Sequence, residues 1–410
     1  MRSSCLNSKL LQLVASIGIF LMLCIGDAFA VDWSLSPSVS VSELYDSNIN
    51  FSFQDKQSDF ITAMKPRFLV SGQTDQDQLN LDSTLVGMIY VDNSQLDRFE
   101  TYNDGSWVRQ WSSRFSTDFG GNFIKTTALE SQLQEAGIRT ILADQYIYNV
   151  RGKGSYALTE VLSLSLGGSA GQTWYPDKQF PDSDNALGNL NLAWKSSEFD
   201  TIGLDCAYSY RHYLDTSTDT VQFVRPGLYW ERALGETTTL LLGAGYRFTS
   251  IKYFNYIFQF EPPDQVRLVK KWTTDTKSTY DFLATLKTSW TDRLSSSFIA
   301  GRDQYSDVDA RTYDHMYVGT GVRYGLTDLT TVNCDVRYDY NNEIAQGTQQ
   351  TDYVRVTPSI DRKLTKDLSV RLSGSYEYER QDVADNRQNA DRFRAWIELF
   401  WQLPRLLESG

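Results

Sequence analysis

The two histidines of the chain are the first residues to consider for acid–base chemistry. His212 and His315 both lie near the expected ends of extended segments. A nucleophilic hydrolase needs a histidine base within reach of a serine, and a third group that orients the imidazole. Asp314 is adjacent to His315, but neighbouring residues of a strand point to opposite faces. We interpret both histidines as residues at the rim of a sheet and predict no enzyme activity; a histidine-dependent hydrolase is the weakest function considered.

Paired carboxylates could perform a different chemistry. Glu377 and Glu379 lie two residues apart, on one face of an extended segment, as the acid pair of a glycosidase could. The same spacing of charged residues recurs along most extended segments of this chain, for example at Asp335, Arg337 and Asp339. A hydrated wall explains the recurrence better than a catalytic pair does.

Metal and redox chemistry have little material. Four cysteines are too few for a disulfide scaffold. Cys206 and Cys334 are predicted on the apolar faces of the ninth and fifteenth strands, too far apart for a disulfide. The loop carboxylates Asp177, Asp182 and Asp184 are a weak calcium candidate, and a solvated acidic loop is the preferred interpretation. We predict no metal and no cofactor.

The composition excludes two further classes. The 410 residues include 39 Lys+Arg and 51 Asp+Glu, for a formal net charge of −12. A nucleic-acid partner is therefore not expected, because binding phosphates needs clustered basic residues. A mean hydropathy of −0.39 argues against a helical membrane protein, but not against a membrane-spanning sheet.

The N-terminus predicts export. Arg2 and Lys9 form a basic region, and an uncharged apolar run follows from Leu10 to Ile25. Ala28 and Ala30 then form a small-x-small cleavage pattern. We predict a cleaved signal peptide at residues 1–30, a barrel domain at 31–402 and a short tail at 403–410. Beyond the signal, the sequence has no apolar run of the ~18 residues that a membrane helix needs.

Apolar and polar residues alternate along the rest of the chain, as in strands with two different faces. In residues 367–380 one face runs from Leu368 to Tyr378 and the other carries Ser369, Arg371 and Glu377. The aliphatic residues come first and the tyrosines last, which matches a lipid-facing band that ends in an aromatic girdle. An outer-membrane β-barrel is therefore favoured over a soluble β-sandwich.

The spacing of the turns predicts the number of strands. Turn signals such as Leu-Thr-Asp and Leu-Gly-Glu are centred near residues 75, 113, 159, 197, 235, 291, 327 and 365, mostly about 38 residues apart. Enlarged loops at 126–138 and 254–276 account for the two longer intervals. Eight short turns predict eighteen antiparallel strands with both chain termini on the periplasmic side, and sixteen is the alternative because 93–125 and 293–308 alternate poorly. Pro37, Pro66, Pro226 and Pro358 recur within strands and predict bulges or strand ends.

An interior of mixed charge follows from this pattern. The charged residues in phase with the polar faces are Asp205, Arg211, Arg247, Asp281, Lys287, Asp335, Arg337, Asp339, Arg355, Arg371, Glu377, Glu379, Arg394 and Glu398. Such a lumen suits a polar solute such as a saccharide better than it suits a selective ion filter. We expect a hydrophilic conduit; the alternative is a structural or adhesive barrel with a closed lumen and partner-binding loops.

The aromatic and basic segment 254–276 is predicted to fold over the lumen as a constriction, and a projecting hairpin is the equal alternative. Its candidate constriction residues are Tyr256, Phe258, Phe260, Lys270 and Lys271.

Two segments resemble a known family. Residues 33–48, Trp-Ser-Leu-Ser-Pro-Ser-Val-Ser-Val-Ser-Glu-Leu-Tyr-Asp-Ser-Asn, look like the first strand of the beta-barrel porin 2 family, and 127–137 resemble its Leu-x-Ser-x-Leu-x-Glu-x-Gly loop. The resemblance implies an outer-membrane barrel, often linked to exopolysaccharide secretion, and supplies no catalytic residues. Expected partners are outer-membrane lipid and lipopolysaccharide, polysaccharide-export components, and the barrel-insertion machinery that reads the last strand, here ending near Trp401.

Overall fold

A computed structural model describes residues 31–405 apart from 215, 262–264, 345–348 and 384–385, together with 407–408. For 255–261, 265–268 and 407–408 it describes the backbone. The predicted signal peptide lies outside the described residues. Within them, neither helical segment has the length and apolar character needed to cross a bilayer.

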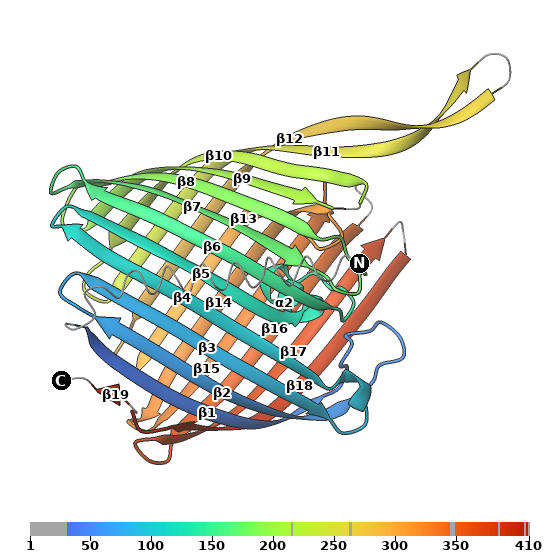
Figure 1. Ribbon diagram of the computed structural model, residues 1–410. Helices are drawn as coiled ribbons and strands as arrows, with labels where there is room; N and C mark the ends of the chain where they lie inside the picture. The colour runs from blue at the N-terminus through green and yellow to red at the C-terminus, as the bar shows by residue number, and fades with distance from the viewer. Residues whose placement is uncertain are drawn as a thin grey trace.

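Eighteen antiparallel strands form a closed barrel in which each strand pairs with its neighbours in sequence (Figure 1). The strands are β1 (Asp32–Asp46), β2 (Asp59–Gln73), β3 (Asp77–Tyr90), β4 (Arg98–Ser112), β5 (Phe115–Thr127), β6 (Asp144–Ala157), β7 (Leu162–Trp174), β8 (Ser183–Lys195), β9 (Asp200–Tyr213), β10 (Thr218–Ala233), β11 (Thr238–Glu261), β12 (Gln265–Ser289), β13 (Leu294–Ser306), β14 (Thr312–Thr327), β15 (Thr330–Glu343), β16 (Gln349–Lys363), β17 (Leu368–Val383) and β18 (Asn386–Gln402).

The barrel closes where β1 pairs with β18, from Ser38 opposite Gln402 to Asp46 opposite Arg394. A two-residue strand, β19 (Leu407–Glu408), continues the pairing along β1. The predicted eighteen strands are confirmed. The alternative of sixteen is wrong, because the weakly alternating stretches 93–125 and 293–308 contain β4, β5 and β13.

The two faces of the wall differ as the alternation predicts. On β17, Leu372 is 55% exposed on the outer surface, whereas Glu377 and Glu379 on the inner face are 1% and 0% exposed. A soluble sandwich would bury the leucine and expose the carboxylates. The outer surface is therefore the apolar one.

Large aromatic side chains lie on the outer surface near both ends of the barrel. Trp194, Trp290 and Trp401 are exposed near the short turns, and Tyr246 and Tyr280 are exposed toward the opposite end. Exposed aliphatic side chains, such as those of Leu228 and Leu242, lie between them. This is the arrangement of a lipid-facing band between two aromatic girdles.

The eight short turns lie where the sequence predicts them, at the end of the barrel that we call the short-turn end. Four of them are built around a threonine. Its hydroxyl accepts a hydrogen bond from the backbone N–H three residues on: Thr74 from Asp77, Thr159 from Leu162, Thr291 from Leu294 and Thr365 from Leu368, at 2.8–3.0 Å. This local bond explains why threonine recurs in the turn signals.

The prolines do not form bulges. Pairing lapses for two residues around Pro226, but the register is the same on both sides, with Val224 opposite Phe248 and Gly227 opposite Gly245. The interruptions at Pro66 and Pro358 also leave the register unchanged. A proline here costs one ladder hydrogen bond and shifts nothing.

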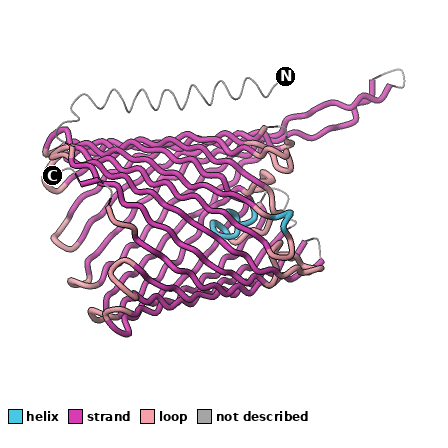
Figure 2. The backbone as a smooth tube through the Cα atoms, turned by 60° about the horizontal axis from the view of Figure 1, so that its bottom comes forward, coloured by secondary structure: helices cyan, strands magenta, loops and turns pink. Residues whose placement is uncertain are grey.

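The opposite, long-loop end carries the other connections, the 3-10 turn η2 (Ser94–Leu96) and the helix α2 (Ala128–Ala136). Figure 2 shows α2 within the outline of the barrel, near the end from which one hairpin projects. The buried apolar clusters of the protein gather around α2 and these loops.

Segment 254–276 does not fold over the lumen. Strands β11 and β12 pair without interruption from Thr238–Thr288 to Glu261–Gln265, whereas β10 accompanies β11 only as far as Tyr253. The hairpin therefore leaves the wall and projects from the barrel (Figures 1 and 2). The constriction expected at Tyr256, Phe258, Phe260, Lys270 and Lys271 is wrong for this structure, because continuous ladder pairing holds the segment straight; α2 occupies the lumen instead.

Candidate functional site: the lumen and its helical constriction

Helix α2 interrupts a chain of strands, and its end is determined by Gly137. This residue has φ of 65°, and its N–H donates to the Leu133 carbonyl, so the helix closes with a left-handed residue. A Cβ at this position would lie 2.6 Å from Cδ1 of Tyr353 on β16. Glycine therefore both ends the helix and lets it lie against the wall.

One face of α2 is buried against the wall and the long loops. Leu129 and Leu133 pack with Phe51, Tyr353 and Ala390, from the β1–β2 loop, β16 and β18. These residues are far apart in the sequence and meet only inside the closed barrel. Burial of two leucines contributes roughly 3–6 kcal/mol, so we treat α2 as a docked element.

An ionic cluster fixes the start of α2. Glu130 accepts hydrogen bonds from Nη1 of Arg392 at 2.8 Å and from Nη1 of Arg394 at 3.4 Å. Arg392 is 1% exposed and also donates through Nη2 to Glu377 at 2.6 Å. Burial opposes the charged form of Glu130, but Arg392 and Arg394 outweigh it and hold the pKa of that carboxyl well below its usual range.

A second set of contacts fixes the end of α2. Arg337 donates to the backbone carbonyl of Glu135 at 2.8 Å, and Asn341 donates to that of Ala136 at 2.8 Å. Tyr305 donates to the Glu135 carboxylate at 3.1 Å. The last carbonyls of a helix lack partners within it and attract a cation. The wall thus binds the start of the helix through two arginines, which contact Glu130, and the end of the helix through side-chain donors, which contact its last carbonyls.

His315 is a structural member of this wall. Its Nδ1 lies 2.9 Å from Asp303 and its Nε2 2.8 Å from Asp339, on the two neighbouring strands. Both ring nitrogens are engaged by carboxylates, which leaves no site to activate a serine. The adjacent Asp314 faces the other side and pairs with Arg302. His212 lies 3.6 Å from Asp219 near the rim.

The described residues contain no group of three or more His, Cys, Asp or Glu side chains placed to hold a metal ion. Asp182, one of the loop carboxylates considered for calcium, accepts from the Tyr175 N–H and pairs with Lys178. Cys206 and Cys334 are free thiols on β9 and β15.

Several predicted lumen residues pair with one another across the wall. Arg247 contacts Asp281 at 2.6 Å, and Arg371 pairs with Asp361 and lies 3.9 Å from Glu398. The remaining contacts of the predicted set are Asp205 with Arg225 at 2.8 Å, Arg211 with the Ser306 carbonyl at 2.9 Å, Arg337 with Asp339 at 2.8 Å, Arg394 with Glu377, and Glu379 with Arg139 at 3.7 Å.

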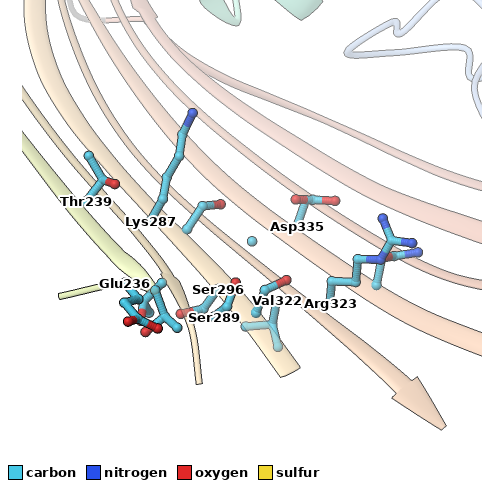
Figure 3. A pocket seen from close by; sticks show the side chains of 14 residues that line it. Glu236, Thr239, Lys287, Ser289, Ser296, Val322, Arg323 and Asp335 are labelled. Atoms are coloured by element: carbon cyan, nitrogen blue, oxygen red, sulfur yellow. The ribbon is translucent and has the colours of Figure 1, made fainter. Parts of the chain in front are cut away.

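Lys287, Asp335 and Arg355 line open space instead. Two adjoining cavities of about 500 and 480 Å³ run along the inner surface from β11 to β18, and share Ser297, Gly321 and Asp335. Figure 3 shows the first cavity, with Lys287, Arg323 and Asp335 around it and Ser289 below. The inner wall around these cavities is thus polar.

Sequence reasoning missed the contacts of α2 with the wall. The loop 126–138 was expected to be enlarged, but not to enter the lumen. A signal was present: Leu129, Gln132, Leu133 and Ala136 recur with helical spacing in a chain where almost everything else alternates by two. Arg392 also extends the inward-facing series of Arg394 and Glu398 by one position.

No family model and no curated protein matches the chain. Similar solved structures include OccK2 (OpdF) of Pseudomonas aeruginosa, at 12% identity and a TM-score of 0.44, covering 90% of this chain and 98% of that one. OccAB3 of Acinetobacter baumannii matches at 10% identity and 0.45, covering 90% and 99%. The ferric-catecholate import receptor Fiu from E. coli K12 matches at 6% and 0.46, covering 89% and 81%.

Proposed function

We propose that the protein is an outer-membrane barrel that forms a hydrophilic conduit for saccharides, narrowed by α2. The observation that carries the proposal is the inversion of the wall, with exposed leucines outside and charged, hydroxyl-rich surfaces inside. A protein in water would not place its apolar residues on the outer face of a closed sheet. Eighteen strands also enclose enough space for an aqueous channel.

The same inversion supports an outer-membrane location. The predicted signal peptide would direct export, the short-turn end would face the periplasm, and the long loops with α2 would face outward. The outer surface would contact lipid and lipopolysaccharide, and β18 would be the strand that the insertion machinery reads. These placements are part of the proposal.

Polysaccharide export is the more specific form of the proposal. It is supported by the family resemblance of residues 33–48 and 127–137. It is also supported by the serine and threonine hydroxyls of the inner wall, which can form hydrogen bonds with the hydroxyls of a sugar. In that case the conduit would work with polysaccharide-export components of the envelope, and α2 would be displaced or bypassed by the passing chain.

Liposome swelling tests the conduit. Purified full-length protein in liposomes should admit small neutral sugars, with a rate that falls as the sugars grow from mono- to tetrasaccharides. A heat-denatured sample of the same preparation is the matched control. No swelling with a protein that retains its folded, heat-modifiable mobility would contradict the conduit.

A closed adhesive barrel is the second candidate, and the projecting hairpin favours it. The pair β11–β12 extends beyond its neighbours and carries exposed basic and aromatic side chains, with Lys270 Nζ 3.5 Å from the centre of the Phe254 ring and 4.4 Å from that of Trp272. Under this function, removing residues 256–270 abolishes cell-surface attachment and liposomes stay impermeable. Permeable liposomes with unchanged attachment would exclude it.

A further inference from the structure

The charges of the inner wall are not equally available to a solute. Around α2, the cations Arg337, Arg392 and Arg394 are each held by carboxylates at 2.8 Å or less. A neutralised pair exerts little net attraction on a third charge. The selectivity of the conduit therefore depends on the side chains that have no partner in the wall.

Three unpaired cations gather on one part of the wall. Lys287 on β12, Arg323 on β14 and Arg355 on β16 have no ion pair or side-chain hydrogen bond within the part of the chain that the structure describes, and all three line the two adjoining cavities. The carboxylates that line the same cavities are Asp335 and, at the rim, Glu236. The excess is positive, although the whole chain is acidic.

The strand register shows why these cations are left free. Arg355 lies directly opposite Arg337 on one side and Glu377 on the other. Glu377 is already engaged by Arg392 and Arg394, so it does not pair with Arg355. Lys287 is opposite Ser297, and Arg323 is opposite Ser295 and Asn333, which carry no charge.

A groove joins the three cations. Gly319 and Gly321 occupy successive inward positions of β14, between the strands that carry Lys287 and Arg355. A Cβ on Gly321 would lie 2.6 Å from the Asp335 carboxylate and 3.0 Å from the Ser297 hydroxyl. The missing side chains hollow the wall between flanking cations, and the serine hydroxyls form its floor.

We propose that this groove, defined by Lys287, Arg323 and Arg355 with Gly319 and Gly321, binds carboxylate-bearing saccharides. The proposal rests on the conduit function and names its substrate class. Guanidinium groups bind carboxylates through paired hydrogen bonds, and Lys287 adds a mobile point charge. The hydroxyls of Ser289, Ser295 and Ser297 suit the neutral hydroxyls of a sugar ring.

The groove also has the right extent for a chain and not only for one sugar. In register terms, Arg355 lies one inward position toward α2 from the row of Lys287 and Asp335, and Arg323 lies one position toward the short turns. Each such step is about 6.6 Å along a strand. The three cations thus follow the wall from below α2 toward the short-turn end.

Single-channel block tests the proposal. The full-length protein is inserted in planar bilayers and blocked with tetragalacturonate or with maltotetraose, a neutral chain of equal length. We expect tetragalacturonate to reach half-block at an at least tenfold lower concentration. Each of Lys287→Gln, Arg323→Gln and Arg355→Gln should raise that concentration about threefold, and the triple variant more than tenfold. Equal block by the two chains in the unaltered protein would overturn the proposal.

Lys153→Gln is the matched control, because Lys153 on β6 lies opposite Asp118, outside the groove, and also makes no ion pair within the described residues. It should leave the half-block concentration unchanged, and an equal effect would show a general electrostatic attraction by the lumen instead of a binding site.

Calorimetric titration of the detergent-solubilised protein separates the two proposals. Binding of tetragalacturonate that the triple variant loses, in a protein without conductance, supports the groove and contradicts the conduit. Conductance without binding does the reverse.

Discussion

Glu130 is the residue on which the attachment of α2 depends most directly. Two arginines of β18, the buried Arg392 and the half-buried Arg394, share this anion, and Glu377 accepts a hydrogen bond from each of them. Removing one partner from such a cluster leaves buried charge uncompensated, which costs more than the pair contributes. This ionic cluster is therefore sensitive to the loss of one charge even where the substituted side chain keeps its shape.

We predict that Glu130→Gln destabilises the folded barrel by about 2–4 kcal/mol and increases fluctuations of the channel current. Urea unfolding in detergent and bilayer noise analysis measure the two effects. Glu160→Gln, in the exposed β6–β7 turn, is the control and should change neither. A Glu130→Gln protein with unaltered stability and unaltered current fluctuations would show that the ionic cluster does not hold α2 in place.

Asp307, in the β13–β14 loop, should make stability depend on pH. Burial, followed by repulsion from Asp309, raises its pKa to about 7. Because the folded pKa is raised, the folded state binds the proton more tightly; stability is full below the unfolded pKa, near 4, and is lost as pH rises toward 7. The urea concentration at the midpoint of unfolding should therefore decrease as the pH is raised from 4 to 7. Asp307→Asn should flatten this dependence, and an unchanged pH profile in the variant would assign it to another group.

At the scale of elements, the strands and turns could be predicted from the sequence, and the docking of α2 could not. Alternation by two and hydroxyl-capped turns are local, so they can be read within about ten residues. The partners of Glu130 lie more than 260 residues away, at Arg392 and Arg394, and meet it only because β18 closes against β1. For the same reason, sequence phase identified charged lumen residues but not which of them neutralise one another.

Removal of the helix and removal of the hairpin should affect conductance differently. Replacing residues 129–136 by a Gly-Ser linker of equal length should raise single-channel conductance, roughly twofold, because it removes the structure inside the lumen. Shortening the hairpin by residues 256–270 should leave conductance unchanged, because that segment projects from the wall. A rise after hairpin removal would restore that segment as the constriction.

Gly137→Ala tests the close approach of α2 to the wall. The substitution puts a side chain at a positive φ and drives a methyl group into the Tyr353 ring. We expect a loss of about 1–3 kcal/mol of unfolding free energy. Gly235→Ala is an informative comparison: its φ of 106° is also positive, but no atom lies within 4 Å, so only the backbone part of the cost should remain.

For the whole molecule, the decisive property is which face of the closed sheet is apolar. Leu372→Arg places a charge on the outer surface of β17, where the proposal puts lipid, and should destabilise the barrel in bilayers by about 2–4 kcal/mol. Thr357→Arg places the same side chain on the inner wall of β16, where a cavity of about 480 Å³ can accept it, and should cost little. Folding yields into liposomes, read by heat-modifiable mobility, compare the two variants. If both arginines were tolerated equally, the outer surface would not face lipid, and the membrane location would fall with it.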